Sequence, residues 1–191
     1  MRIEILLYDG CDDLDVFGPF EVLNHGGLDA RLVTLDPCES VTTSHGARVI
    51  PDGVLGDPDL VLVPGGGWND RSAAGARTEA ERGAIPAALA ARHAAGGRVG
   101  SVCTGAMLLA TAGLLSGRPA VTHHSALDDL RAAGADVRAA ERFVDDGDIV
   151  TAAGVTAGID LALHLVAQAR GQTTATAGAR EIEWDRHLNP A

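Results

Sequence analysis

Gly100-Ser101-Val102-Cys103-Thr104-Gly105 indicates the architecture of this chain more directly than any other segment, because an apolar run ends on a cysteine and an apolar helical pattern follows at once. A strand that turns abruptly into a helix strains the backbone of the turn residue and lifts its side chain out of the sheet. Backbone N–H groups at the start of the helix then favour an anion there. The segment predicts a nucleophile elbow in which Cys103 is the nucleophile and ionises more easily than an ordinary cysteine. The alternative interpretation of Cys103 is a small buried hydrophobic residue.

Length and composition favour one globular unit. The chain has 191 residues, so we expect a single domain over residues 1–191. Apolar residues make up 46% of the sequence but aromatic residues only 3%, which predicts a core built mainly from Ala, Val and Leu. The net charge is -11 and the acidic residues are scattered. This charge argues against nucleic acid or an anionic membrane as a partner.

The cysteines and the apolar runs indicate a cytoplasmic protein. No apolar run reaches the roughly 18 residues that a membrane-spanning helix needs, and the chain opens with a strand-like segment rather than a secretory signal. Cys11, Cys38 and Cys103 lack the even number and dense spacing of a disulfide framework, and no CxxC pair suggests zinc. We therefore expect free thiols and no metal site.

Short apolar runs alternate with helical patterns along the chain. We expect strands over residues 2–8, 30–35, 59–63, 98–102 and 120–122, weaker strands near Val41 and Val49, and a hairpin that joins 142–144 to 149–151. Helices are expected around residues 17–23 with Pro19 in the first turn, and over 79–95, 104–115, 126–133 and 156–169 with Thr156 as an N-cap. The alternation predicts an α/β fold of flavodoxin-like arrangement, with a mostly parallel sheet flanked by helices on both faces. The tail is weakly patterned from residue 172 until 181–188, where Trp184 predicts docking on the body or on a second subunit.

Four loops that follow predicted strands carry the candidate site. Ligands of such sheets bind beyond the carboxyl ends of the strands, where these loops meet. The loops contribute a carboxylate, a glycine-lined backbone, a thiol and an imidazole, carried by Asp15, residues 65–67, Cys103 and His123-His124. We expect the four groups to converge.

The three glycines of residues 65–67 lack the spacing of a dinucleotide fingerprint and the Lys-Ser/Thr ending of a P-loop, so we expect no nucleotide there. Glycine lets the backbone approach a substrate closely. The N–H groups of Gly66 and Gly67 are therefore expected to join that of Thr104 in an oxyanion hole. The alternative is an ordinary tight turn.

Two residues are candidates for proton transfer at the thiol. His123 would orient or deprotonate Cys103, while His124 would point elsewhere on a strand-like backbone; the alternative is a loop histidine satisfied by hydrogen bonds. Asp15 would be a general acid or base if its helix brings it over the elbow, and otherwise an N-cap or turn aspartate. Glu21 lies on the same helical segment, where a charge on a solvated face is the simpler interpretation.

Several separate motifs, in the same order, give the chain a resemblance to the ThiJ/PfpI superfamily, whose fold is class I glutamine amidotransferase-like. They are LDVFGPFEVL at 14–23, PGG at 64–66, VCTG at 102–105, AGLL at 112–115, TH at 122–123 and TAAGVTAGID at 151–160. Within the superfamily the chain is most similar to the isocyanide hydratase branch and to the sensor domain of AraC-type regulators. In those regulators a helix-turn-helix region follows, whereas this sequence stops at Ala191, which disfavours a DNA-binding role.

The resemblance implies roles for individual residues. It implies a nucleophile at Cys103, a partner carboxylate at Asp15, an assisting residue at Thr104 and an aliphatic residue near the thiol at Val155. It also implies a homodimer. The chain departs from the hydratase pattern at His124, where such proteins often carry Trp, and this changes the wall of the expected substrate pocket.

The expected function is an isocyanide hydratase-like enzyme that needs no cofactor or metal. The Cys103 thiolate would attack the terminal carbon of an isocyanide, Asp15 would supply the proton, and water would resolve the thioimidate to an N-substituted formamide. One alternative is a cofactor-independent glyoxalase that uses the same groups on a 2-oxoaldehyde; its members tend to carry Glu in place of Asp15. Another is a non-enzymatic redox or small-molecule sensor in which Cys103 is oxidised.

Overall fold

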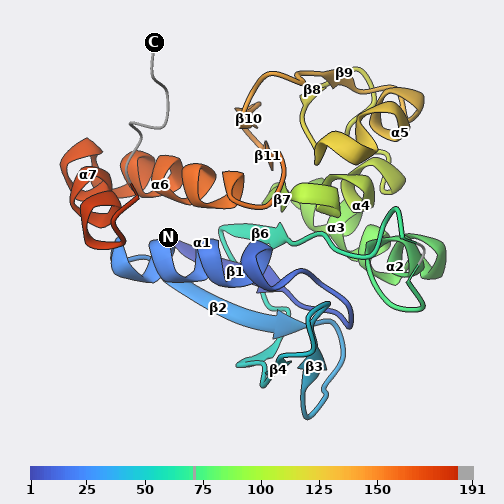
Figure 1. The fold of residues 1–191 in the computed structure, drawn as a ribbon, viewed down its shortest axis with the longest axis horizontal. Helices are drawn as coiled ribbons and strands as arrows, with labels where there is room; N and C mark the ends of the chain where they lie inside the picture. The colour runs from blue at the N-terminus through green and yellow to red at the C-terminus, as the bar shows by residue number, and fades with distance from the viewer. Residues whose placement is uncertain (71, 185–191) are drawn as a thin grey trace.

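A seven-stranded, mostly parallel sheet forms the centre of the protein, which a computed structural model describes over residues 1–70 and 72–184 (Figure 1). Its strands are β1 (Arg2–Leu6), β2 (Asp29–Thr34), β5 (Gly53–Val54), β6 (Leu60–Val63), β7 (Arg98–Val102), β10 (Phe143–Asp145) and β11 (Ile149–Ala152). They lie in the order β10-β11-β7-β6-β1-β2-β5, and within this sheet only the β10–β11 pair is antiparallel. This arrangement confirms the predicted parallel sheet and the predicted hairpin.

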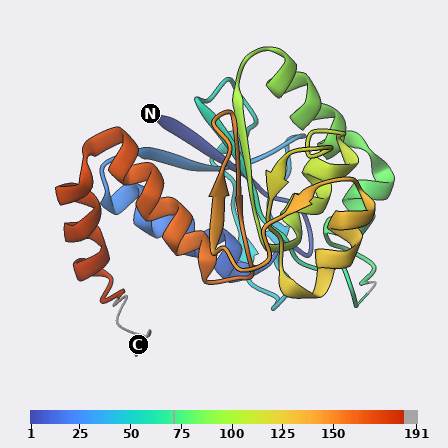
Figure 2. The ribbon, with the colours of Figure 1, turned by 90° about the horizontal axis from the view of Figure 1, so that it is seen from above.

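Helices cover both faces of the sheet, as the alternating pattern predicted (Figure 2). One face carries α1 (Asp13–His25), α6 (Ala157–Arg170) and α7 (Gln172–Glu181), and the other carries α2 (Ala76–Arg82), α3 (Ala84–Ala94) and α4 (Ala106–Thr111). Beside α4 lie α5 (Leu127–Ala132) and the short pair β8 (Pro119–Ala120) and β9 (Asp136–Val137), and a β3 (Val41–Thr42) and β4 (Arg48–Val49) hairpin completes the fold. Among the described residues, none of these helices has both the length and the apolar character that a bilayer crossing requires.

The core lies along the central strands because both faces of the sheet are covered. All four residues of β6 are buried, and so are the last four of β1. Central strands that are buried on both sides must be apolar at nearly every position, which is why β6, Leu-Val-Leu-Val, does not alternate. In β1 the buried Glu4 interrupts the apolar run, and its carboxylate accepts the Gly56 N–H at 2.7 Å. The largest fully buried side chains are all Leu or Ile, so Ile joins the Ala, Val and Leu that the composition predicted.

The order of the strands reverses direction between β1 and β6. From β1 the chain continues to β2 and β5 on one side, and then returns to build β6, β7 and β11 on the other side. Loops that leave adjacent parallel strands in opposite directions open a crevice between them, which is the usual ligand position in this kind of sheet. The loops after β1 and β6 touch there, since the Asp12 N–H donates to the Gly65 carbonyl at 2.8 Å.

Several helix boundaries differ from the prediction, and two of these differences have clear local reasons. The predicted helix over 79–95 is two helices, α2 and α3, because Gly83 has a φ of 78°, a left-handed conformation that glycine adopts without strain. Pro19 lies inside α1 rather than in its first turn. The helix starts early because the Asp12 carboxylate accepts the Leu14 and Asp15 N–H groups at 3.0 and 3.4 Å.

The carboxyl-terminal part also departs from expectation in two places. Residues 172–181 form α7, although their sequence is weakly patterned, because they pack against α6. Thr156 occupies the N-cap position of α6 without making a capping bond, and its hydroxyl binds Arg142 instead. Trp184 docks on the body, since its indole Nε1–H donates to Asp160 Oδ1 at 3.2 Å. Residues 185–188 of the predicted docking segment lie outside the described residues.

Candidate active site

The strand-turn-helix arrangement predicted at Cys103 is present. β7 ends at Val102, Cys103 opens a 3-10 turn, and α4 follows. Cys103 has a φ of 56°, which costs a residue other than glycine about 1–3 kcal/mol and persists only where neighbours enforce it. Two bonds do so: the Cys103 N–H donates to the Ala153 carbonyl, and the Thr122 hydroxyl donates to the Cys103 carbonyl, both at 2.9 Å.

The Cys103 thiol is buried, and this changes its acidity. Only 7% of the residue is exposed. Burial is the main cause that raises its pKa, with the negative charges of Asp15 and Asp12 in support, while hydrogen bonds from the backbone at Thr104 and Val155 lower it. The net effect is a pKa well above that of an ordinary cysteine. The predicted ease of ionisation is therefore wrong for the structure, because the sequence shows the start of a helix but not the depth of the turn beneath its neighbours.

Asp15 lies fully buried beside this thiol. Its Oδ2 accepts the Gly65 N–H at 2.9 Å, and its buried Oδ1 has no hydrogen-bond partner within the described chain. Burial, reinforced by Asp12, raises the pKa of Asp15 to about 8, although the Gly65 N–H and the Cys103 thiol both act to lower it. The N-cap alternative for Asp15 is wrong, since Asp12 caps α1. A buried carboxyl group with a perturbed pKa beside a thiol is typical of a site that moves protons.

The glycine loop packs directly onto the thiol turn. A Cβ atom on Gly65 would lie 2.5 Å from both the nitrogen and the hydroxyl oxygen of Thr104, so only glycine fits there. The Gly66 N–H donates to Thr104 Oγ1 at 3.0 Å, and Gly67, with a φ of 63°, packs against the backbone near Gly75. The Gly66 N–H is thus already engaged, and a part in an oxyanion hole would require this bond to break. The closest approach to the thiol turn belongs to Gly65, which the sequence analysis placed in the glycine loop without giving it a role of its own.

His123 and His124 lie together at the side of the site. The His123 ring packs against Gly154, and its Nδ1 is hydrogen-bonded to Ser125 Oγ at 2.6 Å. Burial, followed by the nearby His124, lowers the pKa of His123, so its imidazole is neutral at neutral pH. The two rings are 4.1 Å apart rather than divergent, because His124 begins a 3-10 turn instead of continuing a strand. Among the hydrogen bonds of the described residues, none joins His123 to Cys103.

Tyr8 is a site residue that sequence reasoning missed. Its hydroxyl donates to the carbonyls of Pro64 and Gly65 at 2.6 and 3.1 Å and so holds the glycine loop in place. Burial, and then the charges of Cys11, Asp15 and Cys103, raise its pKa well above the usual value. Its position just after β1, as the single tyrosine of the chain, is the signal that would have identified it.

Cys11, Cys38 and Glu21, the other residues considered from the sequence, take no part in the Cys103–Asp15 site. Cys11 is fully buried and burial raises its pKa to about 12, Cys38 is exposed, and Glu21 is exposed as expected. The described part of the chain contains no group of three or more His, Cys, Asp and Glu side chains placed to hold a metal ion.

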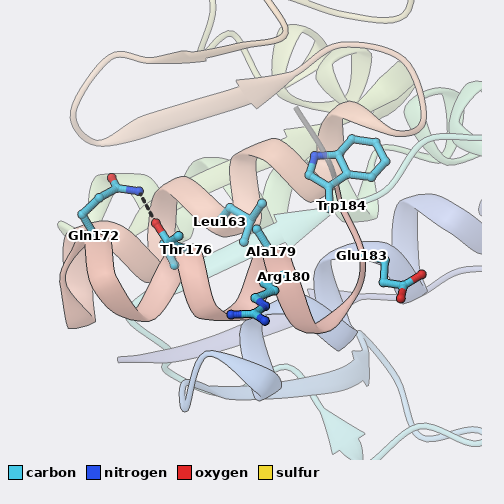
Figure 3. Close-up of a pocket in the computed structure, with 8 residues that line it drawn as sticks. Leu163, Gln172, Thr176, Ala179, Arg180, Glu183 and Trp184 are labelled. Atoms are coloured by element: carbon cyan, nitrogen blue, oxygen red, sulfur yellow. Dashed lines mark hydrogen bonds between the residues drawn. The ribbon is translucent and has the colours of Figure 1, made fainter. Parts of the chain in front are cut away.

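A surface pocket between α6 and α7 contains none of the predicted site residues; Figure 3 shows Trp184 and Gln172 at its opposite ends.

A comparison with known protein families shows the family to which the chain belongs. The profile described as the DJ-1/PfpI family matches residues 1–168. The chain belongs to the DJ-1/PfpI family. This membership confirms the resemblance drawn from the sequence motifs, and it agrees with the fold.

Relatives of this DJ-1/PfpI protein have diverse names. It is 34% identical over 188 residues to "Isonitrile hydratase" of Pseudomonas putida, a match that covers 96% of this chain and 78% of the relative. It is 26% identical to "Parkinson disease protein 7 homolog" of Danio rerio, over 91% of this chain and 92% of that one. It is also 32% identical to the "HTH-type transcriptional regulator GbdR" of Pseudomonas aeruginosa, over 78% of this chain but 40% of the regulator. The names of these relatives therefore do not select between an enzyme and a regulator.

Solved structures of the family share the whole fold. A THiJ/PfpI family protein from Pseudomonas syringae superimposes with a TM-score of 0.84 at 31% identity, covering 100% of this chain and 77% of that one. Drosophila melanogaster DJ-1beta gives a TM-score of 0.82 at 20% identity, over 95% of this chain and 97% of that one. At 20% identity the second likeness concerns the fold alone.

Proposed function

We propose that this DJ-1/PfpI protein is a cysteine-dependent enzyme of the isocyanide hydratase type, which converts an isocyanide into an N-substituted formamide. The observation that carries the proposal is the buried pair at the elbow, in which the Asp15 carboxyl keeps one oxygen unpaired beside the Cys103 thiol. The 34% identity to an isonitrile hydratase supports the choice of substrate class. The pair supplies a nucleophile and a proton carrier, and the proposed reaction uses no cofactor or metal.

The first half of the reaction adds the thiol across the isocyanide carbon. The Cys103 sulfur forms a bond to that carbon while its proton passes to the Asp15 carboxylate. Asp15 then delivers the same proton to the carbon, which leaves a thioimidate, R–N=CH–S, on the enzyme. The backbone at Thr104 and Val155 stabilises the negative charge that develops on sulfur as the thiol proton leaves, before the new bond to carbon is complete.

The second half releases the product with water. Water adds to the thioimidate carbon as Asp15 accepts one of its protons and returns it to the nitrogen. The carbon–sulfur bond of the resulting adduct then breaks, the hydroxyl proton passes to sulfur, and the formamide R–NH–CHO leaves. Asp15 serves as base and acid in turn, a use that suits a carboxyl group whose pKa is raised to about 8.

We propose that the remaining candidates bind the substrate and do not transfer protons. His123 has its Nδ1 occupied by Ser125 and a lowered pKa, so it shapes the pocket wall together with His124. Val155 and the glycine loop with Gly66 and Gly67 border the thiol turn from the other sides. The N–H of Thr104 contributes to charge stabilisation.

A direct substrate test decides between the hydratase and its alternatives. Purified protein is incubated with para-nitrophenyl isocyanide and, separately, with methylglyoxal, and the products are separated by liquid chromatography. We expect the formamide from the first substrate, and no formamide with Cys103→Ala. Lactate alone would replace the proposal with a glyoxalase, and no product from either substrate would favour a sensor.

We also propose that the protein is a homodimer. Leu14 and Phe17, one helical turn apart on α1, are each 39% exposed although they are large and apolar. They flank the buried Asp15, so a second copy seated on them would lie close to the site. Burial of such side chains against a partner is favourable by about 25 cal/mol per Å² of apolar surface.

A further inference from the structure

The loop after β11, residues 153–156, closes over the Cys103 turn. The Cys103 N–H donates to the Ala153 carbonyl at 2.9 Å, and the Val155 backbone lies close enough to the thiol to lower its pKa. Any shift of this loop therefore moves one of the two backbone donors at the sulfur. Arg142, which lies outside this loop, contacts it at both ends.

Arg142, which lies just before β10, contacts both ends of this loop. Its carbonyl oxygen accepts the Ala153 N–H at 2.8 Å, and its Nη2 donates to Thr156 Oγ1 at 3.1 Å. Val155 lies between these two attachment points. One residue thus bridges the segment that presents the Val155 N–H to the thiol.

The Arg142 guanidinium is itself oriented by α6 and the tail. Its Nε and Nη2 both donate to Asp160 Oδ2, at 2.8 and 2.5 Å, while the Trp184 indole donates to Asp160 Oδ1 at 3.2 Å. The Asp160 side chain is only 13% exposed. Two donors from one planar guanidinium fix its orientation more closely than a single ammonium would. The Asp160 carboxylate therefore has both oxygens occupied and holds the bridge in one geometry.

The contacts of Arg142 are expected to add little to the free energy of folding. The Arg142 side chain is 51% exposed, and ion pairs in contact with water typically contribute about 0–1 kcal/mol. By contrast, a catalytic donor that is displaced or lost costs about 100- to 1,000-fold in rate. The contacts of Arg142 are directed at the loop over the thiol, where small displacements matter most.

We propose that Arg142 is a positioning residue for the Cys103 sulfur: by bridging Ala153 and Thr156 it keeps the Val155 N–H on the thiolate, and Asp160 and Trp184 keep Arg142 in place. Its effect on turnover rests on the proposed function. The effect of Arg142 on the reactivity of the Cys103 thiol is independent of the proposed function, because the Val155 N–H acts on the sulfur whatever the substrate is.

The test measures thiol reactivity directly. In a Cys38→Ser background, which removes the exposed cysteine, Cys103 is alkylated with iodoacetamide at several pH values and followed by peptide mass spectrometry. We expect Arg142→Gln to slow alkylation about tenfold at pH 8, because a thiolate that loses a donor has a higher pKa and each pKa unit lowers the thiolate fraction tenfold. Arg142→Lys keeps the charge but loses the paired guanidinium contact with Asp160. Its alkylation rate should lie between those of the parent and of Arg142→Gln.

Arg138→Gln is the matched control. Arg138 is 52% exposed, pairs with Asp136 at 2.5 Å in the same part of the chain, and makes the same change of charge when replaced. Its alkylation rate should equal that of the parent. An Arg142→Gln rate within twofold of the parent, or an equal slowing in Arg138→Gln, overturns the proposal.

Two further measurements keep the result interpretable. If Arg142→Gln does not fold, Thr156→Val removes only the loop end of the bridge; alkylation should then slow severalfold, and an unchanged rate overturns the proposal. With an isocyanide substrate, Arg142→Gln should lower kcat about 10- to 100-fold with little change in KM, since the donor acts on the sulfur rather than on substrate binding. A parent without isocyanide turnover contradicts the proposed function, while the alkylation rates still decide the role of Arg142.

Discussion

At the scale of single residues, burial decides the chemistry of the central pair. An exposed aspartate is ionised at neutral pH, but burial raises the pKa of Asp15 to about 8 and keeps most of it protonated. Burial likewise raises the pKa of Cys103. Below about pH 8 both groups hold a proton, and above it the pair carries one proton that can move between oxygen and sulfur. The singly protonated pair is the form that the proposed reaction needs.

The first prediction is a pH profile. We expect kcat/KM for isocyanide hydration to rise with pH through about 8, because the Asp15 carboxylate must be ionised to take the thiol proton. Asp15→Asn should lower kcat about 100- to 10,000-fold, the usual contribution of a general acid or base. His123→Asn should keep measurable turnover and the same rise. A dead His123 variant beside an active Asp15→Asn would establish a cysteine-histidine mechanism instead.

The second prediction concerns stability. The pKa of Asp15 is raised from 3.8 to about 8, so folding is most favoured by this residue below about pH 4, and that contribution is lost as pH rises towards 8. Asn cannot ionise. The Tm of Asp15→Asn should therefore exceed that of the parent at pH 8 by several degrees, and the difference should be small at pH 4. If calorimetry gives the same Tm difference between Asp15→Asn and the parent at pH 4 and at pH 8, burial does not raise the pKa of Asp15.

At the scale of elements, the site depends on how closely one loop packs on another. Gly65 follows β6, and Thr104 lies in the turn after β7. These strands are adjacent and parallel, so their carboxyl ends meet at the same edge of the sheet. The bond from Gly66 to Thr104 and the two bonds from Tyr8 then hold the glycine loop against the thiol turn.

The third prediction tests this packing. Gly65→Ala should destabilise the fold by about 1–3 kcal/mol, the usual cost of overpacking, and should lower kcat because the new methyl group displaces Thr104. Gly53→Ala in β5 is the control, since a Cβ atom there meets nothing within 4 Å. Thermal melts and isocyanide turnover give the comparison. Parent-like values for Gly65→Ala would contradict the close approach.

At the scale of the whole molecule, the exposed face of α1 would link the proposed dimer to the site. α1 carries the buried Asp15 on one side and the exposed Leu14 and Phe17 on another. Its inner side packs on α6, whose amino-terminal end follows the loop over the thiol. A partner seated on α1 would therefore brace two elements that build the site.

The fourth prediction tests the assembly. Phe17→Glu should convert the proposed dimer to a monomer, because a charge in an apolar interface loses its hydration without gaining a partner. Val54→Glu, which places the same charge at a 47% exposed apolar position on β5, should leave the mass unchanged. Size-exclusion chromatography with light scattering measures both variants. A monomeric parent, or a Phe17→Glu variant that stays dimeric, excludes this face as the interface.

The sequence by itself determined the parallel sheet, the helices on both faces and the strand-turn-helix at Cys103. These features are visible because they rest on local patterns, such as the apolar run that ends at Val102. The motifs also identified the family, because several of them occur in a fixed order. Each motif or apolar run is read from neighbouring residues, and the order of the motifs is read directly along the chain.

Only the tertiary structure decided which groups touch and how they are charged. The bond from Gly65 to Asp15, the two bonds of Tyr8 and the Arg142 bridge join residues that are far apart in the chain or depend on the order of strands in the sheet. That order is not written in any local pattern. The raised pKa values of Cys103 and Asp15 follow from the same cause, because a pKa responds to how much water the assembled fold excludes, and no single segment determines that exclusion.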